Sequence, residues 1–325
     1  MEFMPPFTLH RPGTIEDAVA LRNGDKRARY LAGGTDMVVN VRRGIEQPTA
    51  LIDLNAVEGL QGIEEHAGGW RIGASTTLET LGRHAEVARA YPAVSQAARA
   101  VAGPTHRGYG TVGGNLCLDT RCLFYNQSEW WRRSNHYCLK RNGMVCHVAP
   151  GGKQCFAAFS GDLAPAMLVH DAEVELAGPE GTRRIPLAQI YNDDGMNHLA
   201  LKPAELVVAA HLPRIRGAAK SGYLKSRVRG SIDFPLAGCA VRLTMSGEIV
   251  TALRVALTGV NPYPHLVEGT AEFVGKALDD AALDKLRDTV RKEAKPMHTT
   301  TVKPWYRRRV VGALARKLAQ KLAGG

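Results

Sequence analysis

Five of the six cysteines of this 325-residue chain lie within one stretch, from Cys117 to Cys155. Thiolates are soft ligands that suit zinc or iron–sulfur clusters, and crowded cysteines in a reducing compartment favour a metal site over disulfides. Their spacing matches neither the CxxC pairs of common zinc sites nor a ferredoxin run. The residue types therefore predict a metal centre, and the spacing leaves open whether it holds zinc or an iron–sulfur cluster.

Two glycine-rich loops could bind a cofactor that contains phosphate. Residues 31–36, LAGGTD, put two glycines where a strand should turn, and residues 110–115, GTVGGN, add hydroxyl and amide side chains. Bare backbone amides at such turns can form an anion-binding concavity, and two such loops can enclose one dinucleotide. Residues 108–113 also match GxGxxG, but we expect neither a strand before them nor a helix after them, which argues against a Rossmann site.

The net charge of +11 suggests an acidic partner, although charge alone does not say which kind. Two basic clusters, Arg132 to Arg141 and Lys303 to Lys321, lack the interleaved aromatic pattern of a nucleic-acid surface. The simplest interpretation of both clusters is a solvated face or a contact with another subunit. The N-terminus carries prolines, and no apolar run of about 18 residues follows. We therefore expect a soluble, cytoplasmic protein with no nucleic-acid or membrane partner.

These motifs are distributed over three expected units, residues 1–56, 57–215 and 216–325. The first combines a helix from about Ile15 to Leu21 with short strands on either side of the first glycine loop. The second holds strands, helices and a cysteine-rich insertion at about 119–158, and its segments LAPAMLVHDAEVELAG and TRRIPLAQIY are expected to be strands and connections. The third alternates strands and then turns helical, which indicates an α+β domain.

Five segments, taken in order, resemble one known family: LAGGTDMV, RGYGTVGGNL, SGDLAPAML, ELVVAAHLP and YLKSRV. The chain resembles the FAD-binding medium subunits of the xanthine dehydrogenase and carbon monoxide dehydrogenase family along nearly its whole length. The resemblance implies an α+β protein. Two αβ subdomains of the vanillyl-alcohol-oxidase (PCMH) type would clasp FAD, and a C-terminal α+β domain of the carbon monoxide dehydrogenase flavoprotein type would follow.

The resemblance also implies which residues contact FAD, with no catalytic residue in this chain. Asp162 would hold a polar part of the cofactor, Leu206 would pack the flavin pocket and Lys225 would approach the ring system; otherwise Asp162 is a helix N-cap and Lys225 an ordinary strand lysine. His106, Arg107 and Gly108 replace the Ile-Arg-Asn run that is usual in the family. The remaining FAD contacts are expected at Arg29, Tyr30, Leu31, Ala32, Gly33, Gly34, Thr35, Asp36, Thr111, Gly113, Gly114 and Asn115.

The cysteine insertion departs from the usual family pattern, in which the second glycine loop runs almost directly into the Asp162 segment. Cys117 precedes the insertion, at a position where relatives without it can also carry cysteine. One branch of the family carries such an insertion with a 4Fe-4S cluster beside FAD, which leaves Cys122, Cys138, Cys146 and Cys155 as the expected ligands. His136 and His147 are expected to be loop residues, and Cys239 a buried structural thiol.

In that branch the resemblance implies a dimer of heterotrimers, with a small 2Fe-2S subunit and a large molybdopterin subunit. Electrons would pass from ferredoxin through the 4Fe-4S cluster and FAD to the partners, where a phenolic hydroxyl is removed as water. An alternative is a hydroxylase-type medium subunit that uses NAD or oxygen, with a structural or zinc-binding insertion. A nucleic-acid-binding module built on a zinc loop and the basic tail is a second alternative.

Overall fold

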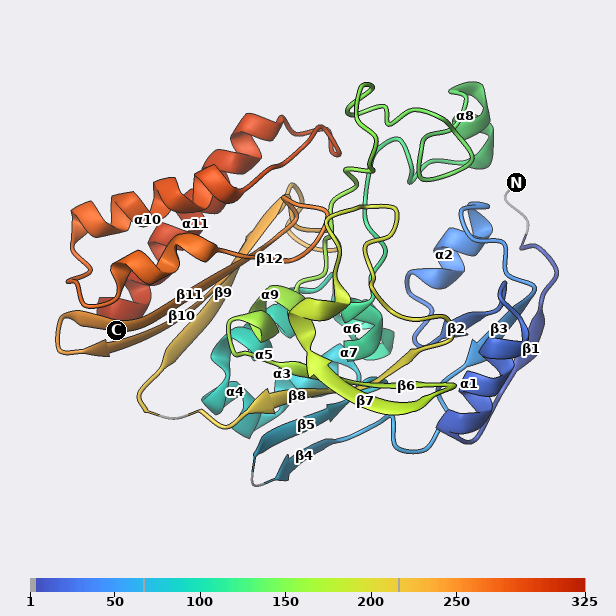
Figure 1. Cartoon of the computed structure of the whole chain (residues 1–325), viewed down its shortest axis with the longest axis horizontal. Coiled ribbons are helices and arrows are strands. Elements are labelled where there is room, and N and C mark those ends of the chain that lie inside the picture. Colours follow the sequence, from blue (N-terminus) through green and yellow to red (C-terminus); the bar gives the residue numbers. More distant parts are fainter. Residues whose placement is uncertain (1–3, 67, 216, 325) are drawn as a thin grey trace.

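The computed structural model describes residues 4–66, 68–215 and 217–324, and within them three separate sheets follow one another along the chain (Figure 1). None of the helices in these ranges has the length and apolar character needed to span a bilayer.

The first sheet is small and parallel, with the strand order β1-β3-β2. The hydroxyl of Thr14 caps the first helix by accepting a hydrogen bond from the backbone N–H of Asp17, and Ile52 is fully buried in the core. Its elements are β1 (Thr8–His10), α1 (Ile15–Gly24), β2 (Arg29–Leu31), α2 (Met37–Arg42) and β3 (Ala50–Asp53).

The second sheet is antiparallel, with the order β4-β5-β8-β6-β7. Its strands are β4 (Ile63–His66), β5 (Gly69–Gly73), β6 (Glu173–Gly178), β7 (Gly181–Pro186) and β8 (Leu206–Pro213). The associated helices are α3 (Leu78–Arg83), α4 (Ala85–Ala90), α5 (Pro92–Ala100), α6 (Pro104–Tyr109), α7 (Val112–Leu116), α9 (Leu163–Leu168) and the 3₁₀ helix η1 (Leu187–Ile190).

The segment LAPAML corrects one expectation, because it forms helix α9 and not a strand. All six of its residues are buried, so the segment has no polar face. A short apolar run without a polar face fits a buried helix or a buried strand equally well, and its hydrophobic pattern cannot distinguish them.

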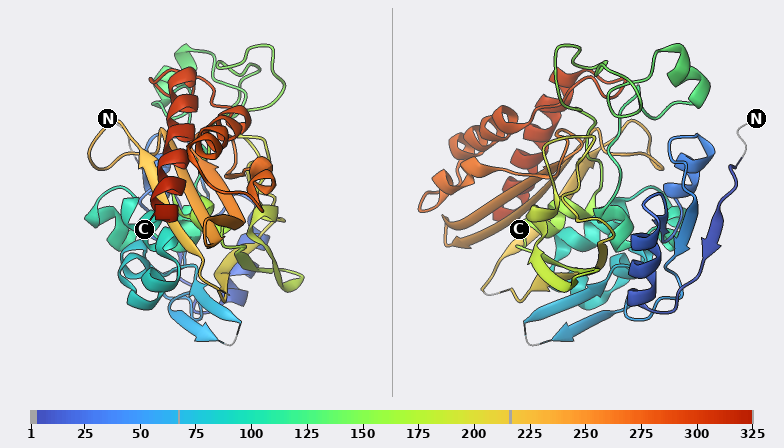
Figure 2. Two further views of the ribbon diagram at one scale, coloured as in Figure 1. Left: turned by 90° about the vertical axis from the view of Figure 1, so that its left-hand side faces the viewer. Right: turned by 45° about the vertical axis from the view of Figure 1, so that its right-hand side comes forward.

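The third sheet has the order β12-β11-β10-β9, and helices α10 and α11 cover one of its faces (Figures 1 and 2). Most of the basic C-terminal segment forms α11, whose Val311 and Ala315 are fully buried in the core. The elements are β9 (Lys220–Ser226), β10 (Ala237–Ser246), β11 (Ile249–Thr258), β12 (His265–Leu266), η2 (Glu268–Phe273), α10 (Asp280–Glu293) and α11 (Pro304–Gly324).

The cysteine insertion projects from one end of the molecule, close to α2 (Figures 1 and 2). Its one regular helix within the described residues is α8 (Glu129–Ser134), and loops form the rest. Arg121 and Ala158 exchange two backbone hydrogen bonds of 2.7 and 2.8 Å, which close the neck of the insertion.

Candidate functional site

The two glycine loops meet backbone to backbone. A Cβ atom added to Gly33 would overlap the carbonyl oxygen of Tyr109, and a Cβ at Gly113 would lie 2.8 Å from the Cβ of Ala74. Gly34 has φ of +71°, a conformation that glycine adopts without strain. Gly33 is therefore required by the close approach of the two loops, and Gly113 by the packing of the second loop against Ala74.

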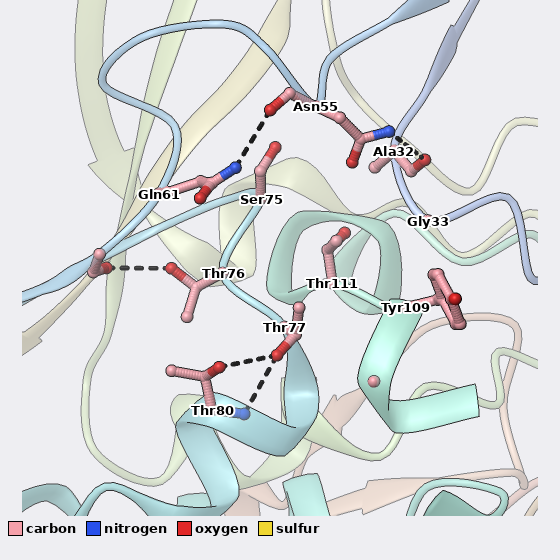
Figure 3. Close-up of a pocket in the computed structure, with 12 residues that line it drawn as sticks. Ala32, Gly33, Asn55, Gln61, Ser75, Thr76, Thr77, Thr80, Tyr109 and Thr111 are labelled. Atoms are coloured by element: carbon pink, nitrogen blue, oxygen red, sulfur yellow. Dashed lines mark hydrogen bonds between the residues drawn. The ribbon is translucent and has the colours of Figure 1, made fainter. Parts of the chain in front are cut away.

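A cavity of about 310 Å³ opens beside this junction (Figure 3). Hydroxyls, amides and bare backbone dominate its wall, and such groups are suitable donors to a phosphate. Asn55 donates to the carbonyl of Ala32 and Gln61 donates to the carbonyl of Asn55, so the wall is held in place by its own hydrogen bonds. The lining residues are Ala32, Gly33, Asn55, Gln61, Gly62, Ser75, Thr76, Thr77, Thr80, Gly108, Tyr109 and Thr111.

Of the residues expected to contact FAD, Ala32, Gly33 and Thr111 line this cavity. Two of the others, Tyr30 and Asn115, make hydrogen bonds to segments beyond the loops. The Tyr30 hydroxyl donates to the carbonyl of Ala204, and the Asn115 side-chain oxygen accepts from the backbone N–H of Leu163. Sequence reasoning missed the other nine lining residues, although the hydroxyl run at residues 75–77, directly after β5 and its flanking alanine, was a usable signal.

The second glycine loop opens helix α7, which contradicts the expectation that no helix follows it. The Thr111 hydroxyl caps this helix by accepting from the N–H of Gly114. Helix α6 and not a strand precedes the loop, so the Rossmann context is still incomplete. A five-residue helix with two glycines has almost no hydrophobic period, which explains why the sequence did not reveal it.

Asp162 and Lys225 form a buried ion pair at 3.1 Å, with side-chain exposures of 4% and 5%. The Tyr223 hydroxyl donates to the same carboxylate at 2.6 Å. Burial raises the pKa of Asp162, and the Lys225 charge opposes that rise. The structure thus brings Asp162 and Lys225 together, whereas Leu206 packs in the core of the first sheet and lies outside the cavity.

The four expected ligand cysteines are buried together in the insertion. Cys122 and Cys138 are 8% exposed, Cys155 6% and Cys146 5%. Burial raises the pKa of the Cys122 thiol to about 11 and that of Cys155 to about 12, and the neighbouring Cys146 adds to both shifts. Burial also raises the pKa of Cys138, and Cys122, Cys138 and Cys155 pack in one buried cluster.

The other cysteines lie elsewhere. Cys117 packs against the core of the second sheet, and Cys239 is fully buried in the C-terminal core, as expected. Nε2 of His147 lies 2.5 Å from the carbonyl oxygen of Tyr137, within the loop. In the described part of the chain, no group of three or more His, Cys, Asp or Glu side chains is arranged to hold a metal ion.

One arginine connects the two regions. Arg121, next to Cys122, forms an ion pair with Asp36 of the first glycine loop, and its guanidinium lies 4.5 Å from the ring centre of Phe234. Asp36 is therefore occupied by the insertion and does not line the cavity. The link joins the cysteine site, the glycine loop and the loop between β9 and β10.

Comparison with known proteins identifies the family. The FAD-binding domain of molybdopterin dehydrogenases matches residues 5–215, and the C-terminal domain of carbon monoxide dehydrogenase flavoproteins matches residues 222–322. This chain belongs to the FAD-binding medium subunits of the xanthine dehydrogenase and carbon monoxide dehydrogenase family. It is a subunit of an oxidoreductase complex, and the predicted fold class is confirmed.

Individual relatives agree with this assignment. The chain is 38% identical over 275 residues to the FAD-binding subunit of an aldehyde oxidoreductase from Escherichia coli K12, covering 82% of this chain and 85% of the relative. It is 29% identical to the carbon monoxide dehydrogenase medium chain of Afipia carboxidovorans, with 97% and 96% coverage. A solved carbon monoxide dehydrogenase from Oligotropha carboxidovorans superposes with a TM-score of 0.82 at 28% identity, covering 99% of both chains.

The residues present fit the FAD that the family binds. Gly33 and Gly113 leave backbone free where a Cβ would intrude, and the cavity beside them is walled by uncharged hydrogen-bonding groups. When bound, FAD supplies a centre that accepts or releases one or two electrons. The residues of this chain would hold that cofactor beside the two glycine loops, which Gly33 allows to approach closely.

Proposed function

We propose that this chain is an electron-transfer subunit that holds both FAD and a 4Fe-4S cluster, with Cys122, Cys138, Cys146 and Cys155 as the cluster ligands. The observation that carries the proposal is four buried cysteines in a single insertion, three of which, Cys122, Cys138 and Cys155, pack in one cluster. Four thiolates are the usual ligand set of such a cluster, and burial protects it from solvent. Alternatives are a zinc-binding or purely structural insertion in a hydroxylase-type subunit that serves NAD or oxygen.

The proposed partners are a small 2Fe-2S subunit, a large molybdopterin subunit that performs the substrate chemistry, and an external one-electron carrier such as ferredoxin. Relatives named as medium chains support an assembly of several subunits, which we propose to be a dimer of heterotrimers. The FAD contacts expected at Asp162, Leu206 and Lys225 remain part of this proposal. So does a cytoplasmic location, where thiols stay reduced, since all six cysteines are free.

Two reactions are candidates for the whole complex. The insertion resembles that of 4-hydroxybenzoyl-CoA reductase, which would make the reaction an anaerobic, ferredoxin-dependent reduction of 4-hydroxybenzoyl-CoA to benzoyl-CoA. The identity of 38% to the FAD-binding subunit of an aldehyde oxidoreductase makes aldehyde oxidation the second candidate. In both cases this chain would conduct electrons and would not contact the organic substrate.

Metal analysis tests the electron-transfer proposal. The complex is purified without oxygen, and iron, sulfide, zinc and FAD are measured with EPR of the reduced state, on wild type, Cys138→Ser and the control Cys117→Ser. We expect about four irons per FAD in this subunit, lost in Cys138→Ser and kept in the control. One zinc, or no metal beside FAD, would return the chain to the hydroxylase class.

Activity then separates the two reactions. The complex is assayed with aldehydes and an artificial acceptor, and with 4-hydroxybenzoyl-CoA and reduced ferredoxin. Turnover of aldehydes alone supports the oxidase reaction, and formation of benzoyl-CoA alone supports the reductase reaction.

A further inference from the structure

A groove of about 710 Å³ lies between the first subdomain and the insertion. Helices α2 and α8, which lie near each other at this end of the molecule, mark its position (Figures 1 and 2). Its walls come from the N-terminal prolines, the segment after α2 and the start of α8. Two bonds hold the walls together: the Arg132 guanidinium donates to the carbonyl of Arg43, and the Arg141 guanidinium donates to the carbonyl of Gly44. The groove is thus built by side chains that the insertion contributes.

The groove is basic. Arg27, Arg42 and Arg43 line it, and the salt bridges described nearby join other residues, Arg29 with Glu46 and Arg132 with Glu129. Among the described lining residues the one carboxylate is Glu129; its charge is thereby neutralised, and the Tyr137 hydroxyl also donates to it. The Arg27 guanidinium donates to the carbonyl of Gln47 at 3.2 Å, and among the described residues none of the three arginines forms an ion pair, so three positive charges face the groove.

An exposed aromatic ring stands at the groove. Trp130 is 75% exposed, whereas the next residue, Trp131, is partly buried beside Phe124 with ring centres 6.2 Å apart. Tryptophan and arginine are the residues most enriched at the energetic centres of protein interfaces. A tryptophan exposed to solvent beside arginines that form no ion pair with the described residues is therefore suited to a protein partner.

The groove also adjoins the cysteine site. Ile45 follows the groove residues Arg43 and Gly44, is 1% exposed, and packs in one cluster with Cys122, Cys138 and Cys155. The backbone of the groove wall therefore continues directly into the buried cluster that contains three of the thiols.

We propose that this groove, lined by Arg27, Arg42, Arg43 and Trp130, is the docking site of an acidic one-electron carrier protein. The inference rests on the proposed function, because it names the partner of the proposed cluster. Charge complementarity selects the partner: the arginines attract an acidic surface over a distance, and Trp130 provides the apolar contact on arrival.

The test uses the assembled complex and an acidic plant-type 2Fe-2S ferredoxin as probe. Arg42→Glu with Arg43→Glu is compared with Arg89→Glu with Lys276→Glu, which makes the same change in net charge on exposed residues outside the groove. Calorimetry should show ferredoxin binding weakened at least about 10-fold in the groove variant, with a flatter salt dependence, and near wild type in the control. Trp130→Ala should weaken binding without changing the salt dependence.

Three outcomes would overturn the proposal. They are no binding of ferredoxin by the wild type, equal weakening in both double variants, and failure of the groove variant to assemble, which would make the groove a subunit interface. Calorimetry detects docking whether or not a cluster is present. If EPR finds no cluster while the groove variant alone loses binding, the cluster proposal fails and the docking site stands.

Discussion

The glycine-loop cradle and the cysteine insertion are built on opposite principles. The cradle is formed by backbone brought close together, and its essential residues are those without side chains, such as Gly33. The insertion has little regular structure and is held by side chains, above all by Arg132, which is 1% exposed. We therefore expect substitutions that add side-chain atoms to disrupt the cradle, and substitutions that remove side-chain atoms to disrupt the insertion.

Gly33→Ala should have the largest effect. The new methyl would overlap the Tyr109 carbonyl, and a backbone carbonyl cannot rotate away as a side chain can. We expect the free energy of FAD binding to become less favourable by about 3 kcal/mol, or roughly 100-fold weaker binding. Flavin absorbance of the purified complex and titration with FAD measure this. Gly108→Ala is the matched control, because it lines the same cavity and its Cβ would meet nothing within 4 Å. Equal losses in both variants would mean that the contact with Tyr109 is not the cause.

Arg132→Met tests the insertion in the same way. The change leaves the carbonyls of Gln127 and Arg43 without their donor and should destabilise the insertion by about 2 to 3 kcal/mol. We expect faster proteolysis within residues 119–158 and loss of metal, while FAD remains bound. Arg133→Met, on the exposed neighbour, should behave as wild type. Loss of FAD in Arg132→Met would show that the two regions are not separable.

Acid should weaken the flavin-binding unit through His170. Burial lowers the pKa of this imidazole to about 3, so the folded protein keeps it neutral while the unfolded chain protonates near 6.5. The stability it contributes is present above pH 6.5 and is lost as the pH falls toward 3. At pH 5 this amounts to about 2 kcal/mol, from roughly 1.4 kcal/mol per pH unit. Denaturant unfolding should give a lower free energy of unfolding at pH 5 than at pH 7.5, and this difference should be smaller in His170→Gln. An equal difference in wild type and variant would contradict the prediction.

Arg121→Gln should have the smallest effect and tests the link between the regions. The change removes the ion pair with Asp36 and the contact with Phe234, each partly exposed to solvent, at a cost of about 1 kcal/mol. FAD should bind about 5-fold more weakly, and Arg121→Lys should recover part of this by restoring the charge. If FAD binding is unaffected by Arg121→Gln, the insertion does not brace the flavin loop.

The sequence was informative where chemistry depends on residue type. It identified both glycine loops, the family and the fold class, because backbone contacts leave a glycine signature and the motifs keep their order. It was misleading at short buried segments: LAPAML and residues 112–116 are helices, yet their patterns show no helical period. It was also silent on the wall of the cavity, where Asn55, Gln61 and Thr80 are ordinary polar residues until folding places them together.

What the sequence alone determined is the inventory: two loops able to approach closely, and an insertion with thiols enough for a metal centre. What tertiary structure decided is which of these groups meet. Cys122, Cys138 and Cys155 share one buried cluster, Asp36 pairs with Arg121, and Arg132 and Arg141 join the insertion to the segment after α2 beside a basic groove. Such pairings join residues far apart along the chain, and no local propensity specifies them, because their energy exists only once the chain has folded.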